Sequence, residues 1–372
     1  MPATPLPADA PSAGPRRDTG ISPDAEPFAD LTPDRILEAI DEILGAPEFP
    51  GGRRTSGQVL ALNSYENRVF QVGIELASGP LAAQEQDAKP APLIAKFYRP
   101  ARWTDAQILE EHAFLQELAD AEVPAVPALR LGGRTLHAVQ GHRVALFERR
   151  TGRTPELSDP AVRERIGRFL GRLHAVGARA GFAARRPLDV ETFGREPAAW
   201  LQEHGWLPPE LAGTYRDLAA QALEMARAAF ERAAPLHIQR VHGDCHPGNL
   251  LWSEAGAQPG PYFVDFDDSA MAPAVQDLWM LLSGERREME LQLRDVLRGY
   301  EMFAPFDRSQ LPLIEPLRTL RLIHYAAWIA RRWSDPAFRA AFPWFPEPRY
   351  WEARVLELRE QLAAMQEEPL EP

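Results

Sequence analysis

The chain has 372 residues, of which 45% are hydrophobic and 25% charged, a composition typical of a globular protein with a substantial core. Its 53 Asp and Glu residues outnumber 41 Lys and Arg residues, so the net charge is -12. A balance this acidic disfavours nucleic-acid binding, which needs a concentrated basic surface. The negative net charge is nevertheless compatible with a local basic pocket that holds a nucleotide.

Cysteine content and hydropathy narrow the expected location of the protein. Cys245 is the only cysteine, so neither an intramolecular disulfide nor a four-cysteine zinc site can form. No apolar run approaches the roughly 20 residues that a bilayer-spanning helix needs. The first residues lack the basic and apolar segments of a secretory signal. We therefore expect a cytoplasmic protein that binds no membrane.

The first third of the chain predicts a tail followed by a β-rich region. Residues 1–27 are rich in Pro, Ala, Asp and Gly, which predicts a disordered tail. Thr32 can cap a helix that begins at Pro33. Alternation of apolar and polar residues predicts a half-buried strand over residues 70–74. A short apolar strand over residues 93–98 carries a single lysine, Lys96.

The remainder predicts one more helix, further strands and then a helical region. Thr104 and Gln107 form a capping box for a helix directly after the lysine strand. Strands are predicted over residues 128–131, 135–139, 144–147, 249–252 and 262–266, and helices dominate from residue 151 onward. We therefore predict an α+β protein with two lobes, a β-rich N-terminal lobe over residues 28–149 and a mainly helical C-terminal lobe over residues 150–372.

The most informative segment reads V-H-G-D-C-H-P-G-N-L-L-W at residues 241–252, and F-V-D-F-D-D follows at 263–268. Phosphoryl transfer needs a carboxylate that orients the attacking hydroxyl and oxygen ligands that hold Mg²⁺. Asp244 and Asn249 have the D-x-x-x-x-N spacing of a kinase catalytic loop, and Asp265 ends the following strand. Each residue alone fits a capped turn or a solvated acidic corner. Their combination favours a kinase.

This pattern resembles the aminoglycoside phosphotransferase and choline kinase superfamily, which shares its fold with protein kinases. More narrowly, residues 62–69, 96–103, 275–282 and 331–338 resemble the bacterial stress response kinase A family. The resemblance extends from about Leu31 to near Leu362, so the Pro-rich tail is an addition.

The resemblance implies a role for each matching residue. Asp244 is the catalytic base, Asn249 and Asp265 bind Mg²⁺, and Lys96 contacts the ATP phosphates. An edge-strand lysine that extends to solvent is the alternative for Lys96. The helix after it can supply a partner glutamate, for which we choose Glu111. The neighbouring Glu110 faces another direction on the helix.

The loop expected to cover the phosphates departs from the protein-kinase pattern. Residues 63–68 read N-S-Y-E-N-R and contain no glycine. Ser64 and the local backbone are the candidates for capping a phosphate, while Arg68 is expected in a strand and facing solvent. The hinge between the lobes, whose backbone binds adenine in the fold that this chain resembles, is expected at residues 147–150.

Supporting roles are expected for two residues near the catalytic motif. Asp277 should accept hydrogen bonds from the catalytic loop, and His242 should order the same loop. Cys245 and His246 suggest a metal site or a Cys–His nucleophile, but the sequence supplies neither further zinc ligands nor oxyanion glycines.

Four other residues have competing interpretations. Asp267 and Asp268 fit a solvated or hairpin-capping role at least as well as a role in the pocket. His324 fits a contact with the acceptor, but a buried and hydrogen-bonded histidine is preferred. Trp328 is expected in the core of the helical lobe.

These observations predict an ATP- and Mg²⁺-dependent serine/threonine protein kinase that acts in bacterial stress response. We expect a monomer that phosphorylates hydroxyl groups of proteins, including its own. The alternative is a small-molecule kinase of the aminoglycoside, choline or homoserine type, whose cationic acceptor would be attracted by acidic residues near the site. A pseudokinase is disfavoured because Lys96, Asp244, Asn249 and Asp265 are all present.

Overall fold

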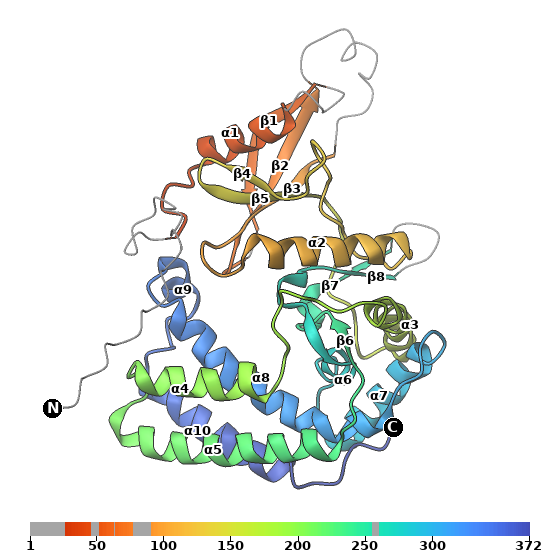
Figure 1. Ribbon diagram of the computed structural model, residues 1–372, viewed down its shortest axis with the longest axis vertical. Helices are drawn as coiled ribbons and strands as arrows, with labels where there is room; N and C mark the ends of the chain where they lie inside the picture. Colours follow the sequence, from red (N-terminus) through yellow and green to blue (C-terminus); the bar gives the residue numbers. More distant parts are fainter. Residues whose placement is uncertain (1–26, 46–51, 63, 77–90, 255–259) are drawn as a thin grey trace, which may run out of the picture.

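The computed structural model describes residues 27–45, 52–62, 64–76, 91–254 and 260–372. These residues form two lobes, with a sheet-containing N-terminal lobe above a mainly helical C-terminal lobe (Figure 1). The predicted two-lobed α+β architecture is confirmed. The predicted tail lies outside the described residues as far as residue 26. None of the helices in the described ranges is long and apolar enough to cross a membrane.

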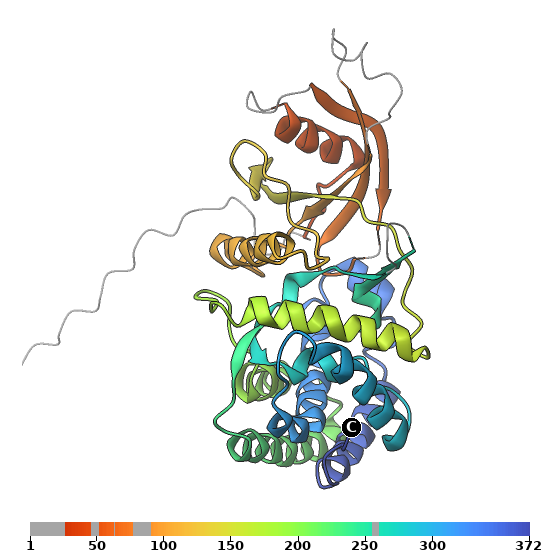
Figure 2. The same ribbon diagram turned by 90° about the vertical axis from the view of Figure 1, so that its right-hand side faces the viewer.

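The N-terminal lobe contains α1, α2 and the strands β1 to β5. Their bounds are α1 (Pro33–Leu44), β1 (Arg53–Ala61), β2 (Arg68–Leu76), β3 (Leu93–Phe97), α2 (Asp105–Asp120), β4 (His137–Val139) and β5 (His142–Glu148). The strands form an antiparallel sheet in the order β1-β2-β3-β5-β4. Helix α1 lies on one face of this sheet, and α2 lies between the sheet and the helical lobe (Figures 1 and 2).

Strand β3 carries Lys96 in the middle of the sheet. Lys96 is opposite Val69 of β2 on one side and Ala145 of β5 on the other. The edge-strand alternative for this lysine is therefore wrong. Apolar side chains of the sheet pack against α1 and fix the strand in place, since Phe97 is fully buried in this core.

The C-terminal lobe combines helices with two small strand pairs. Its helices are α3 (Pro160–Gly177), η1 (Glu191–Arg195), α4 (Glu196–Glu203), α5 (Pro209–Arg232), η2 (Pro247–Asn249), η3 (Phe266–Asp268), α6 (Val275–Trp279), α7 (Arg286–Tyr300), η4 (Arg308–Leu313), α8 (Ile314–Arg331), α9 (Pro336–Ala341) and α10 (Pro348–Ala364). Strand β6 (Ile238–Val241) pairs with β9 (Ala270–Pro273), and β7 (Leu250–Ser253) pairs with β8 (Gly260–Phe263). Strands β7 and β8 lie directly under α2, and β6 lies farther below (Figure 1).

Several strands differ from the sequence prediction. The strand expected over residues 128–131 is reduced to isolated bridges at Ala128 and Leu131. Strands β1, β6 and β9 were not predicted. Most of β1 is exposed, so it lacks the alternation of a half-buried strand, while β6 and β9 are only four residues long and mostly buried on both faces.

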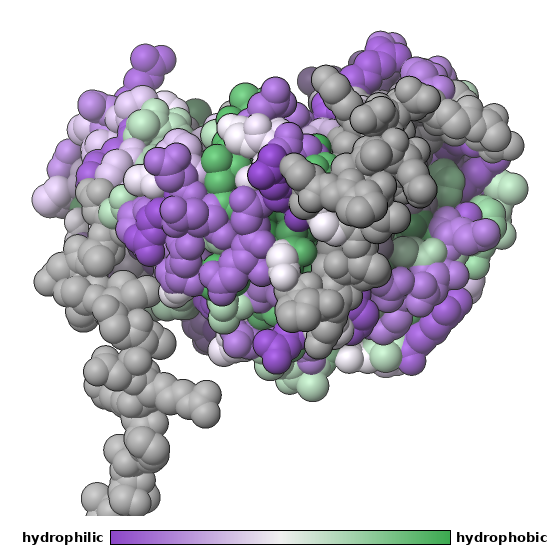
Figure 3. All heavy atoms as spheres, turned by 90° about the horizontal axis from the view of Figure 1, so that it is seen from above, coloured by the Kyte–Doolittle hydropathy of each residue, from purple (hydrophilic) through white to green (hydrophobic). Residues whose placement is uncertain are grey.

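The surface of the N-terminal lobe is mainly polar. Seen from above, its described residues are mostly hydrophilic, with smaller apolar areas between them (Figure 3). The apolar residues are instead gathered inside each lobe, in one cluster around α1 and the sheet and two larger clusters among the helices below.

Helices α3 and α7 pack with their backbones unusually close. A Cβ atom on Gly167 would lie 2.0 Å from the carbonyl oxygen of Val296, and one on Gly299 would lie 1.9 Å from that of Glu164. Both distances are shorter than van der Waals contact, so the two helices can approach in this way only with glycine at these positions.

We expect Gly167→Ala to lower the free energy of unfolding by about 1–3 kcal/mol, because the added methyl group forces the helices apart. Gly213→Ala is the matched control, since nothing lies within 4 Å of its Cβ position on α5. This control should gain about 0.5–1 kcal/mol, because alanine is the better helix former. Urea denaturation measures both changes, and equal effects of the two substitutions would contradict the close packing.

Candidate active site

The loop after β6 is held in place by Asp277. The backbone N–H groups of His242 and Gly243 donate to its carboxylate at 2.7 and 2.9 Å, and His174 Nε2 lies 2.9 Å from the same group. His242 Nε2 is hydrogen-bonded to the carbonyl oxygen of Val264 at 2.9 Å. The predictions that Asp277 accepts hydrogen bonds from this loop and that His242 orders it are therefore confirmed.

Gly243 allows the loop to approach the turn after β8. Its φ is +86°, and a Cβ atom there would lie 2.1 Å from the carbonyl oxygen of Asp268. A side chain would therefore be excluded both by backbone conformation and by space. The contact brings Asp244, the next residue, beside the turn that contains Asp265.

Asp244, Asn249 and Asp265 line a single cavity of about 370 Å³ between the lobes. The hydrogen bond from the Val264 backbone N–H to the Asn249 carbonyl oxygen, 3.1 Å long, fixes the start of the 265–268 turn against the catalytic loop. Ser64 of the N-terminal lobe lines the same cavity. The three polar side chains of the sequence motif thus converge on one cleft.

Asp244 is ionised and held by its neighbours. Its backbone carbonyl accepts a hydrogen bond from Asn249 Nδ2 at 2.9 Å, while Arg321 donates to its carboxylate and His246 Nε2 lies 3.5 Å away. Burial by itself would raise the pKa of Asp244, but the contacts with His246 and Arg321 outweigh it and hold the pKa below its usual range. The carboxylate is therefore available to accept a hydrogen bond at neutral pH.

Asp265 lines the cleft with a carboxylate that could hold a cation. Its backbone has φ 62° and ψ 64°, a left-handed conformation that is strained for a non-glycine residue. The side chain is 56% exposed, and its Oδ1 lies 3.7 Å from Lys96 Nζ. Desolvation of its carboxyl group within the cleft and the nearby Asp267 and Asp268 carboxylates outweigh the opposing charge of Lys96 and raise the pKa of Asp265 to about 7, although part of the side chain remains exposed. A cation bound here would offset this repulsion.

The donor set fits Mg²⁺ better than a transition metal. Asn249 uses its Nδ2 group in the contacts with Asp244, which leaves Oδ1 as an oxygen that could bind a cation. No group of three or more His, Cys, Asp or Glu residues within the described ranges could hold a metal ion. Mg²⁺ needs no such cage, because one or two protein oxygens suffice when phosphates and waters complete its octahedron.

Lys96 lies at the centre of a buried charge cluster. Its Nζ forms an ion pair with Asp267 and lies 3.5 Å from Glu111 Oε1. Burial would lower the pKa of Lys96, but the charges of Asp267 and Glu111 outweigh it and raise the pKa well above its usual value. The ammonium group is therefore permanently charged.

The two neighbouring glutamates of α2 have different partners. Glu111 faces Lys96 with one oxygen and accepts from Arg185 at 2.9 Å with the other. Glu110 instead accepts the backbone N–H groups of Ala183 and Ala184 at 2.6 and 2.9 Å. Glu111 is thus the one of the pair that contacts the lysine, and Glu110 anchors the segment that carries Arg185.

Asp267 is not solvated, so of the interpretations left open for it the solvated one was wrong. The residue is 3% exposed and contacts Lys96, Arg102 and the Nδ2 group of Asn67. Burial would raise its pKa, but Lys96 and Arg102 lower it to about 2. Asp268 is more exposed and pairs with Arg102 at 2.6 Å. Both carboxylates are therefore already neutralised by cations of the N-terminal lobe.

The loop over the cavity is fixed by its side chains. Ser64 Oγ donates to the carbonyl oxygen of Asn67 at 3.1 Å. Glu66 is buried, accepts from Trp328 Nε1 at 2.6 Å and forms an ion pair with Arg332. Contacts with α8 of the other lobe therefore hold down a loop that has no glycine. Asn63 lies outside the described residues.

Asp335 provides a second anchor for the same loop. Arg68 pairs with Asp335 at 3.1 Å, and Arg99 forms a further ion pair with it. The expectation that Arg68 faces solvent was therefore wrong. The sequence analysis missed the role of Asp335, although the segment 331–338 that carries the family resemblance contains it.

One face of α8 forms a wall of the cavity on the side of the C-terminal lobe. Arg321, His324, Tyr325 and Trp328 recur at helical spacing and all line the cavity. His324 stacks on Phe193 at 4.1 Å, and its Nδ1 atom has no hydrogen-bond partner among the described residues. The preference for a hydrogen-bonded His324 was thus wrong, whereas Trp328 both packs against the core of the helical lobe and lines the cavity.

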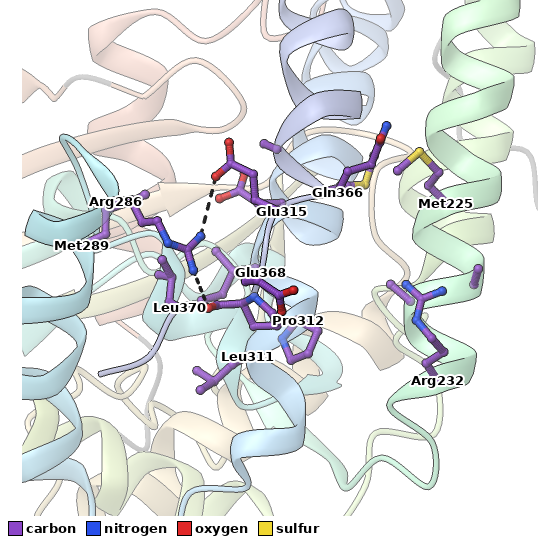
Figure 4. Close-up of a pocket in the computed structure, with 17 residues that line it drawn as sticks. Met225, Arg232, Arg286, Met289, Leu311, Pro312, Glu315, Gln366, Glu368 and Leu370 are labelled. Carbon is purple, nitrogen blue, oxygen red and sulfur yellow. Dashed lines mark hydrogen bonds and ion pairs between the residues drawn. The ribbon is translucent and has the colours of Figure 1, made fainter.

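A different cavity, of about 490 Å³, lies at the far end of the helical lobe. Figure 4 shows Arg286 of α7 extending across it to the C-terminal segment, where it contacts the carbonyl oxygen of Pro369 and lies 3.6 Å from Glu367. The residues of the kinase motif do not line this cavity. It is where the C-terminal segment packs, and it is separate from the candidate active site.

Comparison with known proteins agrees with this geometry. The model of the phosphotransferase enzyme family matches residues 59–314. Among solved structures, an amicoumacin kinase in complex with AMP-PNP and Ca²⁺ has a TM-score of 0.61 at 16% identity, covering 85% of this chain and 90% of that one. A microcompartment-associated aminopropanol kinase has a TM-score of 0.60 at 20% identity, covering 84% and 94%. The chain is thus a member of the phosphotransferase enzyme family with a protein-kinase-like fold.

Curated relatives place it more narrowly. Stress response kinase A of Escherichia coli (strain K12) is 38% identical over 344 residues, which cover 92% of this chain and 96% of that protein. Serine/threonine protein kinase RdoA of Salmonella typhimurium is 36% identical with the same coverage. The chain belongs to the stress response kinase A family, and the predicted resemblance is confirmed.

The buried charge cluster predicts that substitutions of two neighbouring carboxylates change the free energy of unfolding by different amounts. Asp267→Asn should lower the free energy of unfolding by about 3–5 kcal/mol, because Lys96 and Arg102 stay buried with too little negative charge. Asp268→Asn should cost at most about 1 kcal/mol, since its carboxylate is 39% exposed. Chemical denaturation measures both, and similar losses would show that Asp267 is not the charge on which the cluster depends.

Proposed function

We propose that this protein is an ATP- and Mg²⁺-dependent serine/threonine protein kinase that acts in bacterial stress response. The observation that carries the proposal is the convergence of Asp244, Asn249 and Asp265 on one cavity, with Lys96 and Glu111 paired behind it. A nucleotide triphosphate with a divalent cation matches this arrangement of one free carboxylate, two oxygen ligands and one fixed cation.

Asp244 acts on the acceptor hydroxyl. Its lowered pKa keeps the carboxylate ionised, so it orients the hydroxyl by accepting a hydrogen bond. As the hydroxyl oxygen bonds to the γ-phosphorus, the bond from that phosphorus to the bridging oxygen of ADP breaks. The hydroxyl proton passes to Asp244, and ADP leaves with the bridging oxygen.

Lys96 and the oxygen ligands hold the nucleotide. Lys96 Nζ is a fixed point charge for the phosphates, because Glu111 and Asp267 keep it protonated and in place. Asn249 and Asp265 would bind Mg²⁺, which when present neutralises charge on the phosphates. Ser64 lines the cavity, and its hydroxyl, which donates to the Asn67 carbonyl oxygen, would have to turn to donate to a phosphate oxygen.

The protein acceptor is supported by the relatives. The Salmonella relative is named a serine/threonine protein kinase, and the relatives from both genera match nearly the whole chain. The solved small-molecule kinases match at 20% identity or less and support only the fold. A protein hydroxyl, including one on the enzyme itself, is therefore the acceptor that we propose.

Incubation with radiolabelled ATP and Mg²⁺ tests both the site and the acceptor. With a generic protein substrate, label should transfer to protein, and Asp244→Ala should reduce this rate by a factor of about 10²–10⁴ because the hydroxyl loses its base. Asp265→Ala should abolish Mg²⁺-dependent turnover. Asp217→Ala, on the exposed side of α5, is the control and should retain activity.

Two outcomes would overturn the proposal. Undiminished turnover in Asp265→Ala would remove this residue from the metal site. Labelling of an amino alcohol, an aminoglycoside or homoserine in a parallel panel, with none of protein, would establish a small-molecule kinase instead.

A further inference from the structure

On the acceptor side of the cavity, a cationic side chain is in direct contact with the proposed base, Asp244. Arg321 of α8 donates through one guanidinium nitrogen to the carboxylate of Asp244. The Arg321 side chain is 37% exposed, so the group lies at the open part of the cleft and not in the core. A guanidinium group has five N–H donors in a planar fork, and the contact with Asp244 uses only part of it.

The other carboxylates of the cavity offer little to a cationic acceptor. Asp267 and Asp268 are paired with Arg102 at 3.0 and 2.6 Å, and Glu66 lies 3.1 Å from Arg99. Asp244, the proposed base, is itself paired with Arg321, and Asp265, whose carboxylate lies 3.7 Å from Lys96, is the cation ligand of the proposed function. An amine close to the acceptor hydroxyl would therefore meet Arg321 without a carboxylate to compensate.

The remaining wall of the acceptor side is aromatic and uncharged. Tyr325, Trp328 and Phe342 line it, with His324 stacked on Phe193. Burial, together with the nearby arginines led by Arg332, lowers the pKa of His324 to about 3, so its ring is neutral. Arg321 is thus the charged group on α8 that an acceptor chain meets beside Asp244.

We propose that Arg321 is a specificity-determining residue that selects serine or threonine hydroxyls flanked by acidic residues in a protein segment. This inference rests on the proposed function and names the class of substrate for the same site. The incoming hydroxyl takes the place of the guanidinium on Asp244, and Arg321 turns to a carboxylate of the acceptor chain. Neighbouring residues in an extended chain are about 3.5 Å apart, so the carboxylate lies one or two positions from the hydroxyl.

The test compares full-length enzyme on three synthetic peptides that differ only beside a single serine, which is flanked by Glu, by Gln or by Lys. With radiolabelled ATP and Mg²⁺, kcat/KM should fall in the order Glu, Gln, Lys, with about tenfold between the first and the last for one partly exposed ion pair. Arg321→Glu should reverse the order, and Arg321→Lys should retain it with a smaller ratio.

Arg331→Glu is the charge-matched control. Arg331 is on the same helix, does not line the cavity and stacks 5.3 Å from the centre of the Trp200 ring. It should keep the wild-type order, because the preference depends on contact and not on the overall charge of α8. A thermal unfolding curve checks each variant for folding, and Arg321→Lys keeps the test decisive if Arg321→Glu does not fold.

The outcomes separate this inference from the proposed function. Equal rates for the three peptides, with labelling still lost in Asp244→Ala, would overturn the role of Arg321 and leave the protein kinase standing. An equal shift in Arg331→Glu would assign the preference to general electrostatics and also overturn it. If no peptide or protein is labelled, the protein-kinase proposal itself fails and this inference fails with it.

Discussion

The ion pairs around Asp267 are the constraint on which both lobes depend. Lys96 comes from the central strand of the N-terminal sheet, Asp267 from the turn after β8, and Arg102 from the segment between β3 and α2. A buried charge is stable only when it is fully paired, so these groups must stay together. The pairing also fixes the position of Lys96 relative to Asp265, and these are two of the groups that we assign to nucleotide binding.

A second set of contacts fixes the loop over the cleft. Glu66 and Arg68 are tied to Arg332 and Asp335 of the helical lobe, where a protein kinase would use a glycine-rich hairpin. Opening of the cleft therefore requires the separation of ion pairs, several of them buried. Asp244 lies in the cavity that α8 walls on one side; we assign the acceptor to this side and the nucleotide to the side of Lys96.

Sequence reasoning identified the groups that lie close together in the chain. Asp244, Asn249 and Asp265 were found because their spacing is short and the chemistry restricts their residue types. Lys96 and Glu111 followed from a strand and the helix after it. The two-lobed architecture was also predictable, because the periodicity changes from strand to helix near the middle of the chain.

Long-range pairing was not predictable in the same way. The sequence left a solvated and a pocket role open for Asp267, because its partner Arg102 is 165 positions away and sequence pattern does not show that a carboxylate is buried. The contact of Arg321 with Asp244 spans 77 positions and could not be inferred from helix periodicity alone. Strand β1, which is mostly exposed, and strand β9, which is four residues long and mostly buried, were missed because they lack alternation.

A crystal structure with a non-hydrolysable ATP analogue and Mg²⁺ is the most direct test of the convergence of these side chains on one triphosphate. We predict the metal about 2.1 Å from oxygens of both Asn249 and Asp265, Lys96 on the phosphates, and the γ-phosphate facing Asp244 across the cleft. A metal bound away from Asn249 and Asp265, or a γ-phosphate directed away from Asp244, would contradict the account.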